Sequence, residues 1–365
     1  MENNFHDSEW QCDFGDFVFR PGIIGYVLYT PNSFWYSLSM NWNDLSTRIL
    51  EGWQLDRESA MGILKSQDHE LLSLLQAAFT IRRHHFGMGV SLHVIRNAKS
   101  GDCPEDCAYC SQAGKAETDI PKYNLQSVDT IVEGAREAAT LKAMRYCIVT
   151  SGRKPSVADL ETICEAARRI KREIPIQLCT SLGLLTTAQA KTLKDAGVDR
   201  YNHNLETSES HYGAICSTHA YSDRVATAQT VKASGLELCC GGLIGMGESL
   251  EDRVSLALAL RDVGANSIPL NFLDPRPGTK LASLPRISAT DALRALALFR
   301  FANPDRELRV AGGREACLGA LQVLALYPAN SIFTTGYLTT GGQGHSSDIT
   351  MIQSAGFHVS EITDA

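Results

Sequence analysis

Short runs rich in β-branched and aromatic residues alternate with longer amphipathic windows after residue 90. Such runs, bounded by Gly, Pro, Asn and Asp, are typical of strands, and the windows between them are typical of helices. Eight strands are predicted, at residues 92–97, 145–150, 176–179, 200–204, 236–240, 267–272, 308–312 and 330–333.

The windows between these strands carry residues that favour the two ends of a helix. A Ser or Thr before a window accepts hydrogen bonds from free backbone N–H groups, and a Gly after it adopts the left-handed conformation that ends a helix. The predicted N-caps are Ser156, Thr186, Ser222 and Ser288, and the predicted C-terminal glycines are Gly197, Gly235 and Gly264. Each window is therefore predicted to be a helix between two strands.

Eight strands separated by helices predict an α/β fold, the (β/α)8 TIM barrel. A doubly wound open sheet is the alternative, because the pattern does not show whether the sheet closes. A helical segment at 45–86 predicts an N-terminal helical extension. The predicted domains are an irregular or disordered extension at 1–40, a helical cap at 41–90, the barrel at 91–350 and a C-terminal tail at 351–365.

Charge and cysteine content narrow the class of protein. The formal net charge is −7, and without a concentrated basic stripe this argues against nucleic-acid and membrane partners. The run RRIKRE at 168–173 is interpreted as the solvated face of one helix. We expect no membrane span and no signal peptide. The chain has eleven cysteines, an odd number that fits disulfide pairing poorly. We therefore expect a protein of the reducing cytoplasm, where clustered cysteines more often bind metal than form disulfides.

The stretch GDCPEDCAYCSQ at 101–112 places Cys103, Cys107 and Cys110 in one loop after the first predicted strand. Barrel enzymes carry their active-site loops at that end of the strands. Three thiolates can ligate three irons of a four-iron cluster and leave one iron open for a small molecule. Structural zinc is the alternative, but it usually has a fourth ligand nearby, and the next histidine is His203.

The CxxxCxxC spacing, with Tyr109 directly before the last cysteine, resembles the motif of the radical S-adenosylmethionine superfamily. The resemblance implies that the amino and carboxylate groups of S-adenosylmethionine bind the open iron of the 4Fe-4S cluster. It also implies that one electron cleaves the sulfonium and yields a 5′-deoxyadenosyl radical. A fourth protein ligand is then unnecessary, because the cosubstrate takes its place.

Four further candidate ligands lie in strands two, three, five and seven of the predicted barrel: Cys147, Cys179, Cys239 and Arg309. A single buried cysteine is usually a packing residue. Three in separate strands, each able to face the barrel interior, favour a second metal site. Only one of Cys239 and Cys240 can face inward without a bulge, and Cys240 is interpreted as the packing residue.

The four candidate ligands and the stretch YNHNLETS at 201–208 together resemble the biotin synthase family, and the resemblance extends over residues 45–355. The resemblance implies a radical sulfurtransferase that converts dethiobiotin to biotin, with catalytic roles for Cys103, Cys107, Cys110 and Arg309. It implies a 2Fe-2S cluster on Cys147, Cys179, Cys239 and Arg309, one of whose sulfides enters the substrate. Partners implied are a flavodoxin or ferredoxin reductant and a second copy of the chain in a homodimer.

The resemblance also assigns residues to the two small molecules. Asn202 and Asn204 are expected at the ureido group of dethiobiotin or the ribose of S-adenosylmethionine, and Asn271 at the ureido ring. Glu206 is expected to hold the ribose, where the family frequently has Asp. A terminal amide offers both a donor and an acceptor, which a cyclic urea requires.

Residues 241–249, GGLIGMGES, resemble a phosphate loop only weakly, since a lone glycine cluster is not specific. The family resemblance instead places Ile244 and Met246 near the adenine, and Tyr109 with the cosubstrate. Cys12, Cys164, Cys216 and Cys317 match no family motif, and Cys164 is interpreted as a core residue of a helix.

Three alternatives stay open at this point. In the first alternative, the chain is a radical enzyme with the same barrel but acts on another substrate, as hydrogenase-maturation relatives do. In the second alternative, the chain is an electron carrier or a zinc-stabilised scaffold without catalytic turnover. This alternative predicts a fourth ligand close to the other three, and the sequence has none there. A larger auxiliary cluster is compatible with the same ligands, because ligand identity does not fix the number of irons.

Overall fold

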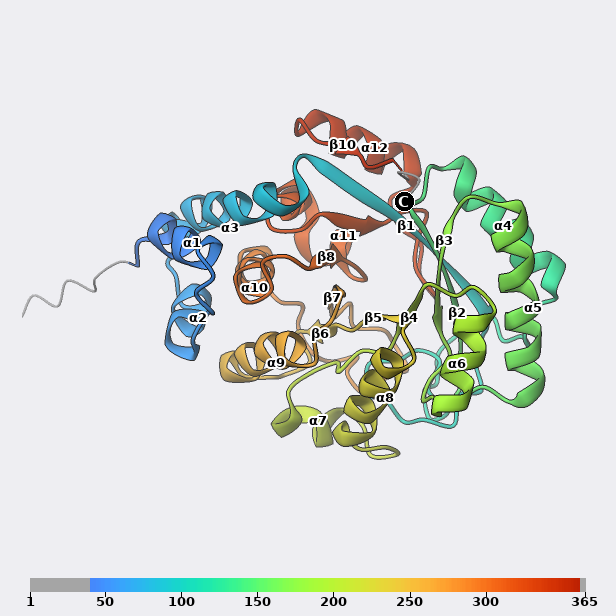
Figure 1. Ribbon diagram of the computed structural model, residues 1–365. Helices are drawn as coiled ribbons and strands as arrows, with labels where there is room; N and C mark the ends of the chain where they lie inside the picture. The colour runs from blue at the N-terminus through green and yellow to red at the C-terminus, as the bar shows by residue number, and fades with distance from the viewer. Residues whose placement is uncertain (1–39, 362–365) are drawn as a thin grey trace, which may run out of the picture. The chain divides into compact units, whose positions relative to one another are not determined.

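The computed structural model describes residues 40–361, in which parallel strands close into a barrel surrounded by helices (Figure 1). Strand β1 (Gly89–Lys99) pairs with β2 (Arg145–Thr150) on one side and with β9 (Ser331–Phe333) on the other. Closure leaves no free edge in the barrel. The predicted (β/α)8 TIM barrel is confirmed, and the open sheet is excluded.

Each of the eight predicted strands overlaps a strand of the barrel. The remaining members are β3 (Gln177–Ser181), β4 (Arg200–Asn202), β5 (Glu237–Cys239), β7 (Ser267–Phe272) and β8 (Glu307–Val310). Two short strands were not predicted: β6 (Gly242–Ile244) and β10 (His358–Val359). β6 continues the line of β5 along β7, while β10 pairs with β1 at Gly89 and Val90.

A glycine explains the break between β5 and β6. A Cβ atom on Gly241 would lie 1.9 Å from the carbonyl oxygen of Pro269 in β7, so a side chain would force the two strands apart. The strand resumes at Gly242, which pairs with Leu270. The sequence pattern shows a single run here because it does not reveal how closely neighbouring backbones approach.

The helices that follow the strands are α4 (Val128–Thr140), α5 (Val157–Glu173), α6 (Thr187–Asp195), α7 (Glu209–Ile215), α8 (Tyr221–Ala233), α9 (Leu250–Asp262), α10 (Ala289–Ala302), α11 (Arg314–Leu318), the 3-10 helix η2 (Gly319–Leu326) and α12 (His345–Ser354). Ser156, Thr186 and Ser288 cap their helices as predicted. Gly197, Gly235 and Gly264 have positive φ angles and follow helix ends, also as predicted. The predicted N-cap Ser222 is wrong.

The cause of that error is the side chain one residue further along. Asp223 accepts a hydrogen bond from the backbone N–H of Ala220, so α8 begins at Tyr221 and Ser222 lies inside its first turn. A carboxylate at the third helical position satisfies a free N–H group as a capping hydroxyl would. The Ser before an acidic residue was therefore a misleading signal.

Three helices precede the barrel: α1 (Trp42–Leu50), α2 (Arg57–Leu64) and α3 (Leu71–Phe86), with the 3-10 turn η1 (Asp68–Glu70) before α3. Figure 1 shows them beside α9 and α10, and α2 and α3 contact α10 directly. Consequently α10 is buried from Ala292 to Ala302, between the barrel and the N-terminal helices. Most of these positions are apolar, and the two buried arginines of α10, Arg294 and Arg300, donate hydrogen bonds to Asp68 and to the carbonyl of Pro328.

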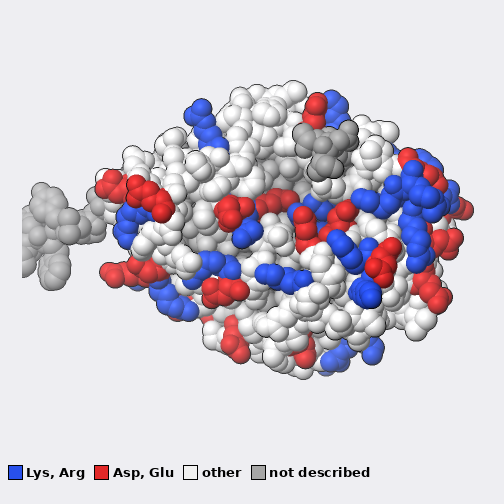
Figure 2. All heavy atoms as spheres, viewed as in Figure 1, with Lys and Arg blue, Asp and Glu red and all other residues white. Residues whose placement is uncertain are grey.

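Basic side chains on the face shown in Figure 2 are interleaved with acidic ones. On α5, Arg169 forms ion pairs with Asp129 and Glu173, and Lys171 pairs with Asp199. The run at 168–173 therefore contributes paired side chains to the surface. Among residues 40–361, no helix is both long enough and apolar enough to span a bilayer. Predictions for residues 1–39 and 362–365 lie outside the described residues.

Candidate active site at the carboxyl end of the barrel

A cavity of about 350 Å³ collects most of the predicted site residues. Its wall includes side chains from the strands and from the loops that follow β1, β4, β8 and β9. The size is within the range of small-molecule sites in proteins. The loops after strands of a barrel are where such enzymes place their active sites.

The cysteine loop after β1 is anchored to the segment after α7. The N–H of Ala108 donates to the carbonyl of Ile215 at 2.8 Å, and the Asp106 carboxylate accepts from the N–H groups of Ser217 and Thr218 at 2.9 and 3.2 Å. The hydrogen bonds from Ser217, despite burial, hold the pKa of Asp106 well below its ordinary value. A buried ionised carboxylate thereby fixes the loop's position.

Of the three loop cysteines, Cys110 lines the cavity and Cys103 and Cys107 do not, and all three are half-buried. Burial raises the pKa of the Cys110 thiol to about 11 and also raises the pKa of Cys103. The hydrogen bond to Cys216, followed by burial, raises the pKa of Cys107. In the metal-free chain these groups are neutral thiols, so metal binding releases their protons.

The strand cysteines converge inside the barrel. Cys147 and Cys179 are register partners on β2 and β3, and Cys239 lies on β5. All three are at most 5% exposed, pack in one cluster with Phe333, and line the cavity. Cys240 packs instead in the main core, which agrees with its predicted packing role.

Arg309 of β8 completes this set. Its Nη1 lies 3.9 Å from the Sγ of Cys239, and its Nε is buried without a hydrogen-bond partner among the described residues. Three thiols and a guanidinium with an unused nitrogen on one cavity wall fit an iron–sulfur group, for which thiolates are the usual ligands. The donor chemistry therefore matches the predicted second metal site.

Glu307, which sequence reasoning missed, holds Arg309 in place. Its carboxylate accepts hydrogen bonds from Arg309 and Arg200, from the Ser267 hydroxyl at 3.0 Å and from the Ser331 hydroxyl at 3.2 Å, and contacts His93. Burial opposes ionisation, but Arg200, His93 and Arg309 outweigh it and keep the pKa of Glu307 well below its ordinary value. The sequence did hold a signal for Glu307: it stands two positions before Arg309, and residues two apart in a strand lie on the same face.

The polar segment after β4 forms a hydrogen-bonded chain. The Asn202 amide donates to the Sγ of Cys239 at 3.2 Å and to the Oδ1 of Asn204 at 3.1 Å. The Asn204 amide in turn donates to Glu206 at 3.5 Å. All three line the cavity, so the chain runs from a strand thiol toward the cysteine loop.

Glu206 has two unusual properties. Its φ is +70°, the left-handed region that a non-glycine side chain seldom adopts. Burial raises its pKa above the ordinary value, although Arg224 lies 3.7 Å away and opposes the shift. Strained backbone and a buried carboxylate on a cavity wall are both typical of functional sites.

Asn271 lies on the cavity wall, where its amide joins two backbone segments. It donates to the carbonyl of Gly242 at 3.1 Å and accepts from the N–H of Gly312 at 2.8 Å. An amide has two N–H donors and two acceptor lone pairs, so one of each is left for a ligand.

The structure does not bring Ile244 and Met246 to the cavity. Ile244 packs in the main core, Met246 packs in a second cluster with Ala108, and Leu243 lines the cavity instead. The buried carboxylate of Glu248 accepts from the N–H groups of Gly245 and Met246 at 2.8 and 2.7 Å. It thus occupies the donors that a phosphate loop would offer to an anion.

Tyr109 lines the cavity, and burial raises its pKa. Cys164 is in the core as predicted, and Cys12 lies outside the described residues. Sequence reasoning missed the loop residues Tyr337 and Thr340, which also line the cavity and come after the last barrel strand, where no chemical motif marks them.

Solved structures share this fold. Methylornithine synthase superposes with a TM-score of 0.77 at 19% identity, over 87% of this chain and 97% of that one. The FeFe-hydrogenase maturase HydG from Carboxydothermus hydrogenoformans gives a TM-score of 0.74 at 16% identity, over 88% and 80%. At these identities the likeness concerns the barrel alone.

Sequence comparisons are more specific. The Radical SAM superfamily matches residues 99–260, and the Biotin and Thiamin Synthesis associated domain matches residues 269–358. The biotin synthase of Salinibacter ruber is 54% identical over 316 residues, covering 87% of this chain and 88% of its own length. That of Lysinibacillus sphaericus is 48% identical over 320 residues, covering 88% and 97%. The chain therefore belongs to the biotin synthase family, among the radical S-adenosylmethionine enzymes.

Proposed function

We propose that this chain inserts sulfur into dethiobiotin to form biotin, with S-adenosylmethionine as cosubstrate and two iron–sulfur clusters. The observation that carries the proposal is that both thiol sets border one cavity, Cys110 from the loop and Cys147, Cys179 and Cys239 from the strands. Amides and a carboxylate lie between them on the same wall. A substrate held there is within reach of both sets.

In this proposal Cys103, Cys107 and Cys110 hold a 4Fe-4S cluster, and Cys147, Cys179, Cys239 and Arg309 hold a 2Fe-2S cluster. When bound, the first supplies an electron to S-adenosylmethionine and the second supplies sulfur. The thiols release their protons as the clusters form. Glu307 keeps the Arg309 guanidinium on the cavity wall and balances its charge.

The polar groups divide the cavity between two ligands. Asn271 and Asn202 are proposed to bind the ureido ring, because each amide has a donor or acceptor unused by the protein. Asn202 also contacts Cys239, so a ligand bound there lies beside the strand thiols. Asn204, Glu206 and Tyr109 are proposed to bind the nucleoside, where two ribose hydroxyls can donate to a carboxylate.

Partners and compartment follow from the same family. We propose that a flavodoxin or ferredoxin delivers the electron, that the chain forms a homodimer, and that it works in the cytoplasm. All ten cysteines of the described residues are free thiols, which suits a reducing compartment. Size-exclusion chromatography with light scattering tests the dimer.

The deciding experiment uses chain reconstituted anaerobically with iron-57. Mössbauer spectra are recorded before and after addition of dethiobiotin, S-adenosylmethionine and reductant, and biotin is quantified. We expect a four-iron signal together with a two-iron signal that fades as biotin appears. A single four-iron cluster that yields deoxyadenosine without biotin would contradict the proposal and favour a radical enzyme with another substrate.

A further inference from the structure

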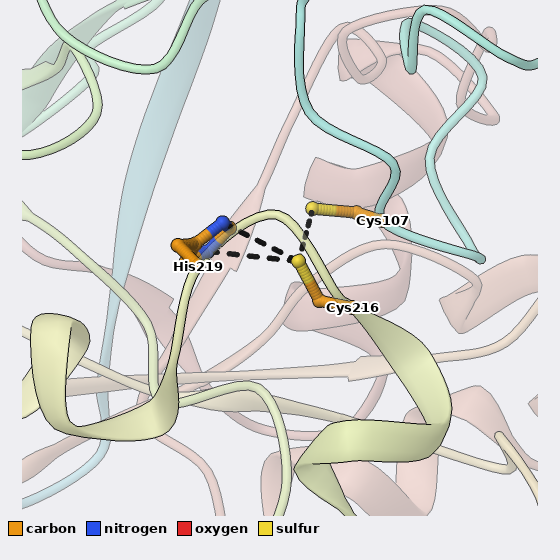
Figure 3. A group of neighbouring side chains, drawn as sticks. All are labelled: Cys107, Cys216 and His219. Carbon is orange, nitrogen blue, oxygen red and sulfur yellow. Dashed lines mark hydrogen bonds between the residues drawn. The ribbon is translucent and has the colours of Figure 1, made fainter.

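Three side chains of metal-binding type meet between the cysteine loop and the segment after α7: Cys107, Cys216 and His219 (Figure 3). Their ligand atoms all lie within 4.8 Å of one another, and no other group of three within residues 40–361 meets this spacing. Cys216 follows α7 and is buried, and His219 lies shortly before α8. The group is thus formed by two segments more than a hundred residues apart in the chain.

The spacing suits one tetrahedral ion. The Sγ atoms of Cys107 and Cys216 are 3.9 Å apart, and the Sγ of Cys216 lies 3.3 Å from the Nδ1 and 3.9 Å from the Nε2 of His219. With metal–sulfur bonds of about 2.3 Å and metal–nitrogen bonds of about 2.0 Å, tetrahedral ligands are separated by roughly 3.5–3.8 Å. A small contraction of the group would therefore complete three bonds to one ion.

Glu105 gives the imidazole the orientation that a metal ligand needs. The Nδ1–H of His219 donates to the Glu105 carboxylate, which leaves the lone pair of Nε2 free for an ion. The hydroxyl of Thr218 also donates to this carboxylate, and both the His219 and Glu105 side chains are below 10% exposed. A carboxylate behind a ligating histidine is the usual outer partner in zinc sites.

We propose that, when the four-iron cluster is absent, Cys107, Cys216 and His219 bind one thiophilic divalent cation such as Zn²⁺ or Fe²⁺. Two metal–sulfur bonds and one metal–nitrogen bond form, each thiol that is still protonated releases its proton to solvent, and a water takes the fourth position. No electrons are transferred. The ion and the cluster exclude each other because both require the Cys107 sulfur, an exclusion that rests on the proposed role of Cys107 in the cluster.

The cation alone is tested first, with Co²⁺ as a spectroscopic probe of the metal-free, reduced chain. One equivalent is expected to give the visible bands of a tetrahedral site and a sulfur-to-cobalt charge-transfer band, both removed by Zn²⁺. X-ray absorption of the zinc form is expected to show two sulfur and two nitrogen or oxygen neighbours. Three sulfur neighbours would overturn the proposal, because they would assign the ion to Cys103, Cys107 and Cys110.

Variants locate the ion. Cys216→Ser and His219→Gln are expected to lose the tetrahedral bands, and Glu105→Gln is expected to weaken Co²⁺ binding about tenfold. The double variant Cys103→Ala, Cys110→Ala keeps all three proposed ligands and is expected to retain the bands. Cys164→Ser, which removes a buried thiol on α5, is the control that leaves them unchanged. Bands that survive in Cys216→Ser but vanish in the double variant would refute the site.

Exclusion is tested by preloading one equivalent of Zn²⁺ before cluster reconstitution. Four-iron assembly is expected to slow in the parent chain and to proceed normally in Cys216→Ser. Equal rates in both would refute the exclusion. Failure of the proposed function can be told apart from failure of the metal site. If only the proposed function fails, the cobalt bands still depend on Cys216, but no four-iron signal forms under any condition.

Discussion

The two thiol sets around the cavity are built in opposite ways. Cys103, Cys107 and Cys110 lie within eight residues of each other on a half-buried loop that side chains from another segment hold in place. Cys147, Cys179 and Cys239 come from three strands, and the barrel's register brings them together. Spacing along the chain therefore defines the first set, whereas the closed fold defines the second.

Their surroundings differ as well. The loop thiols lie near acidic side chains: Asp106 of the loop is an ionised carboxylate, and Glu105 is among the groups that raise the pKa of Cys103. The strand thiols face Arg309, which pairs with Glu307, and Glu307 also pairs with Arg200, so the three side chains form one buried network of charges. A buried cationic group near thiolates stabilises negative charge without contact with water. The strand set is thus buried beside paired charges, whereas the loop set is only half-buried.

The sharpest break between the two sets is a cysteine substitution in each. Cys103→Ala, Cys107→Ala or Cys110→Ala is expected to abolish cleavage of S-adenosylmethionine. Cys147→Ala is expected to keep that cleavage and to lose sulfur insertion, because the loop set stays complete. Deoxyadenosine and biotin measured in the same reaction separate the two effects. Equal loss of deoxyadenosine in both classes would contradict separate roles.

Removing the charge of Glu307 is the next largest change. Glu307→Gln leaves Arg309 and Arg200 without their shared buried carboxylate, and we expect it to destabilise the metal-free chain by about 3–5 kcal/mol. After reconstitution, this variant should lose more of the two-iron Mössbauer signal than of the four-iron signal, relative to the parent chain. Glu237→Gln removes a half-exposed partner of Arg200 and should cost no more than about 1 kcal/mol.

If Glu237→Gln destabilised the chain as much as Glu307→Gln, burial of the network would not be its source of strength. If Glu307→Gln lowered both iron signals equally, Glu307 would support the fold in general and not the strand set. The stabilities of the two variants are compared by urea unfolding of the metal-free chain.

A smaller effect is expected at Asn271. Asn271→Asp keeps the acceptor for the N–H of Gly312 but removes the donor that serves Gly242 and a ureido oxygen. We expect the KM for dethiobiotin to rise about tenfold, with the rate of deoxyadenosine formation little changed, because one hydrogen bond to an uncharged ligand is lost. A fall in kcat with unchanged KM would argue against a substrate contact.

Sequence reasoning succeeded where the signal is local or is carried by a family motif. Alternation along the chain predicted all eight barrel strands, and spacing identified Cys103, Cys107 and Cys110. It missed contacts that only closure creates, such as Glu307 on Arg309 and Cys216 on Cys107. It placed Ile244 near the adenine, and that contact stays a prediction, because Leu243 is the neighbour that lines the cavity.

The smallest expected effect concerns the strained backbone at Glu206, which ends the hydrogen-bonded chain that runs through Asn204 and Asn202 to Cys239. Asp tolerates the left-handed region better than Glu does, since its short side chain can hydrogen-bond to its own backbone. Glu206→Asp is therefore expected to stabilise the metal-free chain by about 0.5–1 kcal/mol in urea unfolding. The shorter side chain should also alter the KM for S-adenosylmethionine.

Lys142→Asn is the matched control, because Lys142 has a φ of +56° in the turn after α4 and does not line the cavity. Relief of strain there should raise stability by a similar amount and leave the KM for S-adenosylmethionine unchanged. A change of KM in Glu206→Asp alone would tie the strain at Glu206 to ligand binding. Unchanged stability in Glu206→Asp alongside a gain in Lys142→Asn would show that the surrounding loop, and not the side chain, imposes the conformation at Glu206.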